Sequence, residues 1–259
     1  MTHATVQDAH DAARPAGALP DSWRQEVLST FTSDLLDDAS PFPCTFGAAG
    51  MRRGTLRFAF VEGARDERSL LGLRDSLASY MQTYRTLGRL TSFVAFFRPS
   101  AIEQPLRSYE REFWGVLQFL HDHDPREWPQ GIPADAEEPR WEFSFCGEPV
   151  FVVCNTPAHR RRRSRRSAGM LITFQPRWVF EGLEGDSPRG RAAREVIRRR
   201  LISYDDVPPH HSLGDYGDPG NREWRQYFLP DADDATQPAR CPFHASSGER
   251  GGEELGRAA

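Results

Sequence analysis

A single histidine stands directly before a run of arginines in the segment NTPAHRRRRSRRS, which spans residues 155–167. The imidazole of His159 could ligate a metal ion or exchange a proton near neutral pH. The six guanidinium groups between Arg160 and Arg166 could donate paired hydrogen bonds to carboxylate or phosphate groups. Imidazole on iron with guanidinium on propionates is one way to hold a haem, so this segment is a candidate wall of a haem site.

A solvated loop or a basic arm is the plainer interpretation of any charge run. Three features favour an ordered site here. A strand is predicted before the run and another after it, the turn Pro157–Ala158 leads into it, and it lies inside the chain rather than at a terminus. The residues by themselves therefore predict a site for an anion and a metal around His159, without naming a reaction.

The other histidines have competing explanations. His121 and His123 end a predicted helix, where the C-terminal end of the helix dipole already favours a histidine. His210 and His211 lie in the loop segment PPHHSLGDYG, where both a role in a site and simple packing in a turn remain open. His159 leaves a predicted strand through a proline turn and is the favoured metal ligand.

Two of the four cysteines, Cys44 and Cys241, lie beside a proline. A thiolate there could ligate haem iron, but a free cysteine more often packs as a small apolar side chain. Cys146 and Cys154 lie in a predicted hairpin and are expected to pack in the same way. With no CxxC pair and no zinc-finger spacing, the sequence predicts reduced thiols in a cytoplasmic protein.

Composition and missing motifs exclude several classes of protein. All 33 basic residues are arginines, yet the net charge is −4, which argues against general binding of nucleic acid. No segment approaches the ~18 to 20 apolar residues of a membrane span, and the first residues lack the apolar core of a signal peptide. The sequence also lacks the GxGxxG, P-loop, HExxH and GxSxG motifs of the common nucleotide-binding and hydrolytic sites.

The elements that would position His159 follow from hydrophobic spacing. Helices are predicted over residues 21–40, 67–88, 101–124 and 187–205, strands over 55–62, 91–99 and 169–176, and a hairpin over 141–156 that turns at Cys146–Pro149. A loop-rich region follows from residue 205 to 242. These elements predict an α+β fold with a single domain over residues 21–245, a mixed or antiparallel sheet and packed helices, between disordered ends at 1–20 and 246–259.

Six phrases in one order resemble the YqcI/YcgG family, and within it the branch of haem-dependent N-hydroxylases. They cover roughly residues 40 to 243 and read FPCTFGAAG, FWGVLQFLHDHDPREWP, WEFSFCGEPVFVVCNTPAHRRRRSRR, ITFQPRWVFEGL, LGDYGDPGNREWRQYFLPD and RCPF. The branch is similar to a guanitoxin-pathway enzyme that hydroxylates a cyclic guanidine and to a cycloserine-pathway enzyme that makes hydroxyarginine.

The resemblance implies haem b as the cofactor and a set of residues that hold it. The family segment P-x-H... R-x-S-R falls on Pro157, His159, Arg162, Arg163, Ser164 and Arg165, and the segment H-x-x-LG-x-YG falls on His210, Leu213, Gly214, Tyr216 and Gly217. The residues expected to bind the cofactor are therefore His159, Arg162, Arg163, Arg165 and His210. His159 is the expected ligand of iron and His210 its rival.

The hypothesis is a haem-dependent N-oxygenase that uses dioxygen and an electron donor to hydroxylate a guanidine or amine nitrogen of an arginine-like small molecule. Glu103, Asp215 and Glu223 are candidate partners of the substrate cation, no further catalytic residue is assigned, and a homodimer remains open. A carrier or sensor of haem or another anion, without turnover, is the alternative. A nucleic-acid contact through Arg160–Arg166 is the least favoured, because the chain is acidic and lacks a second basic stripe.

Overall fold

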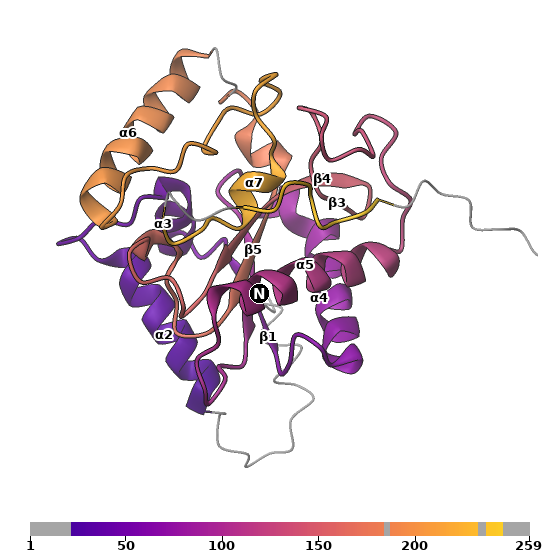
Figure 1. Cartoon of the computed structure of the whole chain (residues 1–259), viewed down its shortest axis with the longest axis horizontal. Coiled ribbons are helices and arrows are strands. Elements are labelled where there is room, and N and C mark those ends of the chain that lie inside the picture. The colour runs from indigo at the N-terminus through magenta and orange to yellow at the C-terminus, as the bar shows by residue number, and fades with distance from the viewer. Residues whose placement is uncertain (1–21, 184–186, 233–236, 246–259) are drawn as a thin grey trace, which may run out of the picture.

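The computed structural model describes residues 22–183, 187–232 and 237–245 of the 259-residue chain (Figure 1). The predicted disordered ends, 1–20 and 246–259, lie outside the described residues. A five-stranded mixed sheet forms the centre of the described part, with strand order β1-β2-β5-β4-β3. In that order the strands are β1 (Arg57–Val61), β2 (Phe93–Phe97), β5 (Leu171–Pro176), β4 (Glu148–Asn155) and β3 (Ser144–Phe145). The prediction of an α+β fold with a mixed sheet is confirmed.

The sheet combines one parallel pair with antiparallel neighbours. Strands β1 and β2 run parallel, with Phe58 opposite Val94, and the helix α4 (Glu67–Leu87) connects them. Strand β5 runs antiparallel to both β2 and β4. Two parallel strands need a long crossover connection, whereas two antiparallel strands can be joined by a short hairpin. Helix α4 is the crossover between the parallel strands β1 and β2.

Helices cover both faces of the sheet, and β2 contributes to both. Val94 and Phe96 pack in one cluster with Val27 of α2 (Ser22–Leu36). Phe93 and Phe97 point to the other face and join the large core cluster under α4 and α5 (Leu106–Asp122). A strand buried on both faces reads as an unbroken apolar run, which explains the segment FVAFF.

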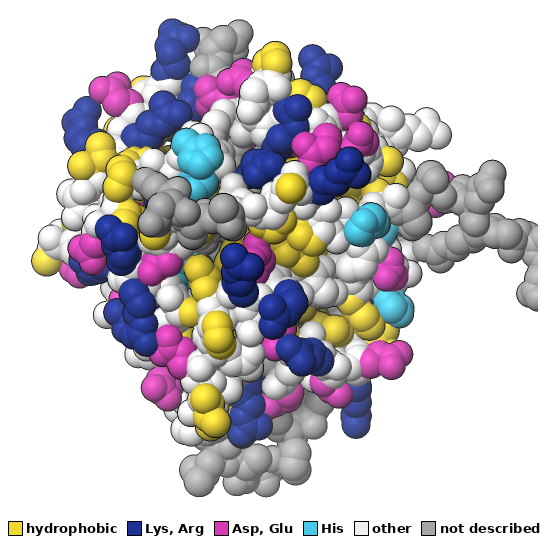
Figure 2. Space-filling model, viewed as in Figure 1, with side chains coloured by type: hydrophobic (Ala, Val, Ile, Leu, Met, Phe, Trp, Pro, Cys, Tyr) yellow, Lys and Arg dark blue, Asp and Glu magenta, His cyan; other side chains and the backbone are white. Residues whose placement is uncertain are grey.

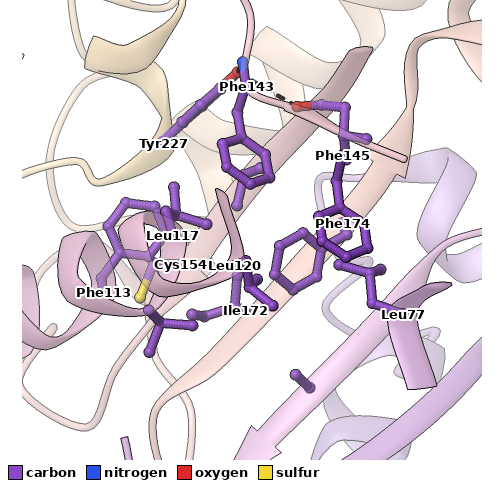
Figure 3. Close-up of a cluster of buried hydrophobic side chains, with 14 of the residues drawn as sticks. Leu77, Phe113, Leu117, Leu120, Phe143, Phe145, Cys154, Ile172, Phe174 and Tyr227 are labelled. Atoms are coloured by element: carbon purple, nitrogen blue, oxygen red, sulfur yellow. Dashed lines mark hydrogen bonds between the residues drawn. The ribbon is translucent and has the colours of Figure 1, made fainter. Parts of the chain in front are cut away.

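The large core cluster lies between α5 and the sheet. Figure 3 shows Phe113, Leu117 and Leu120 of α5 beside Ile172 and Phe174 of β5. These three α5 residues recur at intervals of three and four, so they lie on one face of the helix. The apolar residues whose spacing predicted this helix are thus the ones that pack against the sheet.

Most predicted boundaries of helices are confirmed to within two residues, and two are wrong, because α2 ends at Leu36 instead of residue 40 and α5 starts late. Helix α4 begins after Asp66, whose carboxylate accepts the backbone N–H of Ser69 at 2.8 Å, and it ends before Gly88, which has φ 98°. Helix α5 begins after Pro105, several residues later than the predicted start at 101, because Pro105 is extended (φ −59°, ψ 149°). Proline thus marks the boundary and does not lie inside the first turn.

The predicted hairpin is confirmed. Cys146 and Gly147 form a two-residue turn with φ 54° and 76°, so that Phe145 pairs with Glu148. Positive φ at both central residues matches the right-handed twist of the flanking strands, and glycine adopts it without strain. This hairpin fixes where β4 begins, and β4 then runs to Asn155, where the segment with His159 starts.

The second half contains one predicted helix and several short ones that hydrophobic spacing missed. Helix α6 (Pro188–Tyr204) is confirmed, and the side chain of Ser187 caps it. The missed elements are α3 (Thr45–Arg52), η1 (Arg163–Arg165), η2 (Arg177–Phe180) and α7 (Trp224–Tyr227). Helix α7 packs on β4 beside α5 (Figure 1). Among the described helices, none has the length and apolar character needed to cross a lipid bilayer.

Candidate functional site

His159 lies fully buried just beyond the end of β4, with both ring nitrogens bonded. Its Nδ1 lies 2.9 Å from the hydroxyl of Thr156, and its Nε2 lies 2.9 Å from the carbonyl oxygen of Leu229. Because a carbonyl only accepts, Nε2 carries the proton and Nδ1 accepts from the Thr156 hydroxyl in the neutral ring. The imidazole therefore ties the arginine segment to the chain that follows α7.

Burial lowers the pKa of His159 to about 4, and the hydrogen bond to Leu229 only partly opposes that shift. The nearby Arg165 guanidinium lowers the pKa further. The ring is therefore neutral at pH 7. A histidine that ligates a metal and a histidine that packs in the core are both neutral, so the pKa does not distinguish these two roles.

The stability of the protein should fall with acidity because of this ring. An unfolded histidine takes up a proton near pH 6.5, whereas the native ring does so only near pH 4, so the unfolded state binds more protons between these values. Between pH 7 and pH 5 this group should remove about 2 kcal/mol of unfolding free energy. Urea unfolding at the two pH values should show a smaller loss in His159→Gln. An NMR titration that places the His159 pKa near its ordinary value would contradict the prediction.

The backbone of the arginine run binds an anion, and the chain itself supplies it. One carboxylate oxygen of Asp231 accepts the N–H groups of Arg160, Arg161 and Arg162, each at 2.9 Å. Successive amides that converge in this way form a concave site for negative charge. This part of the segment is therefore an anion site already filled by Asp231.

The arginine side chains of the segment have different surroundings. Arg162 is 1% exposed, and its guanidinium donates to the carbonyl oxygens of Pro230 (2.9 Å) and Pro208 (3.2 Å). Arg163 is exposed and lies over the ring of Tyr204, 4.9 Å from its centroid. Arg162 therefore holds two loops together, whereas Arg163 faces solvent.

Arg165 is the arginine of this segment that best fits an external anion. It is buried, and its Nη2 donates to the carbonyl oxygen of Gln226 at 3.1 Å. Its Nη1 is buried with no hydrogen-bond partner among the described residues. Burial, together with the neighbouring Arg162, lowers the pKa of Arg165 to about 10. The nearby Asp205 carboxylate is held by Ser164, whose N–H and hydroxyl donate to it at 2.6 and 2.8 Å.

His210 lies in the same region but is 2% exposed and differently bonded. Its Nδ1 accepts the backbone N–H of Ser212 at 3.2 Å, and its ring lies 4.2 Å from that of His211. The Pro208 carbonyl that accepts from Arg162 lies two residues before it. The structure thus brings His210 to the edge of the arginine segment.

Neither imidazole fits a haem iron as it stands. A histidine that ligates a metal through one ring nitrogen donates from the other, usually to a carbonyl or carboxylate. Nε2–H of His159 donates a hydrogen bond to the carbonyl oxygen of Leu229, and Nδ1 accepts from the Thr156 hydroxyl, so neither nitrogen is open to a metal. Nδ1 of His210 accepts a hydrogen bond from Ser212, whereas ligation through Nε2 would require Nδ1 to donate one. Iron ligation by either residue stays a prediction that requires a ring nitrogen to change its partner.

A second polar cluster, missed by sequence reasoning apart from Glu223, lies at the N-terminal end of α7. Arg177 donates to both oxygens of Glu142 at 2.6 Å and to Glu223 at 2.9 Å. Both carboxylates are buried, with side-chain exposures of 0% and 4%, and the ring centroid of Tyr216 lies 3.7 Å from the guanidinium. A glutamate inside the apolar run WEFSF was the available signal, since a buried charge needs a partner.

Electrostatics hold this cluster together. Burial raises the pKa of Glu142 to about 7, although the Arg177 guanidinium opposes the rise. Burial also lowers the pKa of Arg177, but Glu142 and Glu223 raise it by more, so the net shift is upward. The guanidinium is thus held as a cation between two carboxylates that share its charge.

Helix α7 joins the two clusters. The backbone carbonyl of Gln226 accepts from Arg165, while the Gln226 amide donates to Glu223 at 3.2 Å. Asn221 donates to the same Glu223 oxygen at 3.1 Å. A buried polar network therefore runs from the arginine segment through α7 to the Glu142–Arg177 pair.

The remaining candidate residues lie elsewhere. Glu103 forms an exposed ion pair with Arg160, and Asp215 pairs with Arg194 at 2.8 Å. His123 donates from Nδ1 to the carbonyl oxygen of Phe119 at 2.9 Å and stacks on its ring, in line with a helix-terminal role. Within the described part of the chain, no group of three or more His, Cys, Asp or Glu side chains could hold a metal ion.

The cysteines are unpaired thiols. The sulfur of Cys44 accepts the N–H of Gly47 at 3.3 Å and caps α3, and burial raises the pKa of this thiol. Burial raises the pKa of Cys241 to about 12. Cys154 is fully buried in the core (Figure 3), where its pKa is also raised by burial. These surroundings favour protonated, packed thiols over thiolate ligands.

Comparison with known proteins decides the family. Residues 31–244 match the model of the YqcI/YcgG family. The chain belongs to the YqcI/YcgG family. The matched range contains both polar clusters and α7. No solved structure matches the chain.

Three relatives within the YqcI/YcgG family show how far the likeness extends. "Uncharacterized protein YcgG" of Bacillus subtilis (strain 168) is 42% identical over 224 residues, 85% of this chain and 88% of the relative. "Uncharacterized protein YqcI" of the same organism is 39% identical over 224 residues, 85% and 87% of the two chains. "Putative N(omega)-hydroxy-L-arginine synthase DcsA" of Streptomyces lavendulae is 33% identical over 227 residues, 85% and 84%. The last name supports the N-hydroxylase branch.

Proposed function

We propose that this protein hydroxylates a guanidine or amine nitrogen of an arginine-like small molecule. The observation that carries the proposal is the likeness to the protein named as an N(omega)-hydroxy-L-arginine synthase. That likeness covers 85% of this chain and 84% of the relative, so it extends over most of both proteins.

The proposal includes haem b, dioxygen, an electron donor and a cytoplasmic location, all of which rest on the sequence and its resemblance. Haem would supply the activation of dioxygen, and the protein would bind and orient the substrate. His159 remains the proposed iron ligand, with His210 as its rival, and Arg165 is the arginine whose unpaired Nη1 suits a propionate. Arg162 and Arg163 were also expected to bind the cofactor. The guanidinium of Arg162 already donates hydrogen bonds to two backbone carbonyls, and Arg163 faces solvent.

The distribution of charge gives no support to the nucleic-acid alternative. On the face shown in Figure 2, arginine side chains alternate with acidic ones and form no continuous stripe. Several arginines of the chain are also paired with carboxylates, as Arg160 is with Glu103. Binding to a phosphate backbone relies on an uncompensated basic surface.

Turnover of L-arginine tests the proposal. With dioxygen, an electron donor and protein reconstituted with haem, mass spectrometry of the reaction should detect Nω-hydroxy-L-arginine. Turnover of L-lysine, which lacks the guanidinium, would show that an amine can react, and turnover of agmatine would show that the substrate carboxylate is not required. A protein that binds haem but oxidises none of these would contradict N-hydroxylation and favour a carrier or sensor.

A further inference from the structure

Three consecutive residues, Leu229–Asp231, bond the main polar groups of the arginine segment. We call them the strap; they follow α7 after one intervening residue (Figure 1). The carbonyl of the first strap residue accepts from His159, the carbonyl of the second accepts from Arg162, and the carboxylate of the last accepts the N–H groups of residues 160–162. One short stretch of chain thus satisfies an imidazole, a guanidinium and an amide site together.

The groups that the strap satisfies are of the kinds that bind a carboxylate-bearing ligand. Converging backbone amides bind anions, guanidinium groups pair with carboxylates, and a neutral imidazole is a common metal ligand. The amide site accepts a carboxylate already, because one oxygen of Asp231 lies 2.9 Å from each of the three nitrogens. The strap therefore takes up the donors that an external carboxylate would use.

The charges around the strap favour an anion whenever the strap leaves. Arg162 and Arg165 are both buried, and Asp205 lies 3.9 Å from the Arg162 guanidinium. Asp205 and Asp231 together balance these two cations. Without Asp231, one buried positive charge among the four groups would lack a counter-ion, which is costly.

Arg165 points independently to a missing acceptor. It is 8% exposed, and its Nη1 has no hydrogen-bond partner among the described residues even with the strap in place. A buried donor without a partner is costly to the folded protein, and an anionic ligand would satisfy it. The strap thus fills the arginine segment incompletely.

The strap also explains why His159 does not fit a haem iron as it stands. The Nε2–H of His159 is bonded to the strap, and the ring of Phe228, the residue before the strap, lies 5.7 Å from the imidazole. Withdrawal of the strap would release Nε2, one guanidinium bond and three amides in a single movement. One ligand could therefore exchange for one segment.

We propose that the strap is an internal stand-in for an anionic ligand, and that its displacement opens a site where the amides of residues 160–162, Arg162 and Arg165 bind a carboxylate-bearing molecule beside His159. Such a ligand binds only the displaced state, so its apparent affinity is reduced by the fraction of protein in that state. The identification of the ligand with haem b rests on the proposed function, whereas the exchange of the strap for an anion does not.

Asp231→Asn tests the proposal through the affinity for haem b. Asparagine keeps the shape of the strap but lacks the negative charge, so the closed state is weakened while the site itself is unchanged. The apparent Kd for haem b, followed by the Soret band, should fall about tenfold or more relative to wild-type protein. A residue that only supported the fold of the site would give the opposite result, weaker binding.

Asp124→Asn is the matched control. Asp124 also accepts backbone N–H groups, those of Arg126 and Cys146 at 2.9 Å each, but it does so at the β3–β4 hairpin. This variant should lose stability and keep the wild-type affinity for haem b. An equal gain of affinity in both variants would show that general loosening of the fold admits haem, and would contradict the strap.

Hydrogen exchange gives a second readout. A ligand that binds a preformed site lowers exchange around it, whereas displacement of the strap should raise exchange in the peptide 228–232 when wild-type protein binds haem b. Haem b dimethyl ester, whose carboxylates are blocked, should not raise it. Inorganic phosphate is the third arm: a rise with phosphate alone would show that a free anion suffices, and a rise with haem b alone would assign the site to the haem carboxylates.

Failure of the strap and failure of the proposed function give different results. The inference is wrong if Asp231→Asn binds haem b no more tightly than wild-type protein, if exchange in the peptide 228–232 falls on binding, or if neither haem b nor phosphate binds. Protein that hydroxylates L-arginine but shows neither strap response contradicts the inference alone. Protein that shows both strap responses but oxidises no guanidine or amine contradicts N-hydroxylation alone.

Discussion

Arg177→Met should destabilise the protein by about 3 to 5 kcal/mol at pH 7, the largest effect expected of a single substitution here. The change removes the guanidinium that binds both Glu142 and Glu223 and leaves two buried carboxylates without their cation. Methionine retains most of the apolar length of the side chain, so the loss is chiefly electrostatic. Urea unfolding measures it.

The variant should regain stability as the pH falls. Without Arg177, the folded-state pKa values of Glu142 and Glu223 rise further above 4.5, the ordinary value of a glutamate. The native state then binds more protons than the unfolded state, so acidification toward pH 5 favours folding. Arg89→Met is the matched control, because Arg89 pairs with Glu181 at 3.1 Å where both side chains are about half exposed. That variant should lose less than about 1 kcal/mol.

A loss below about 1 kcal/mol in Arg177→Met, with no recovery at low pH, would contradict the cluster as described. Glu142 and Glu223 would then be neutral or solvated, and the network through Gln226 would not depend on the ion pair.

His159→Ala should abolish both haem retention and turnover if His159 ligates iron. The wild-type protein, reconstituted with haem b, should show a Soret band and a histidine-type ferrous–CO spectrum. Exogenous imidazole should partly restore haem binding to His159→Ala, which a mere loss of packing would not allow. Cys44→Ser and Cys241→Ser should leave the spectra unchanged, because burial keeps both thiols protonated.

The rival ligand gives the opposite pattern. If His210→Ala loses haem and activity while His159→Ala keeps both, His210 would be the residue that holds the iron, and His159 would serve only to link Thr156 to Leu229. A thiolate-type CO spectrum would overturn both assignments. The absence of a Soret band after reconstitution would remove haem from the proposal.

The elements with local signals were predictable from sequence. Helix α4 has a capping aspartate, an amphipathic row and a terminal glycine, and β2 is a short apolar run, so each pattern lies within its own element. Helix α7 has only four residues and lies in a segment dense in turn-forming residues, and it is helical because Trp224 and Tyr227 are buried against α5 and β4. Tertiary contact there overrides local propensity.

The site was predictable only in part, because its contacts join distant parts of the chain. The sequence identified His159 and the arginine run, but Asp231, which fills the backbone anion site, lies 71 residues from Arg160. Arg177 likewise lies 35 residues from Glu142 and 46 from Glu223. The six arginines of residues 160–166, interrupted only by Ser164, look alike in sequence, whereas burial separates Arg162 and Arg165 from the exposed Arg163.

The most direct test of N-hydroxylation is the origin of the new oxygen atom in the product. Haem-loaded wild-type protein should convert L-arginine, under dioxygen labelled with heavy oxygen and with an electron donor, into Nω-hydroxy-L-arginine carrying one labelled oxygen. Unchanged L-arginine, or a product whose oxygen comes from water, would contradict the proposed function.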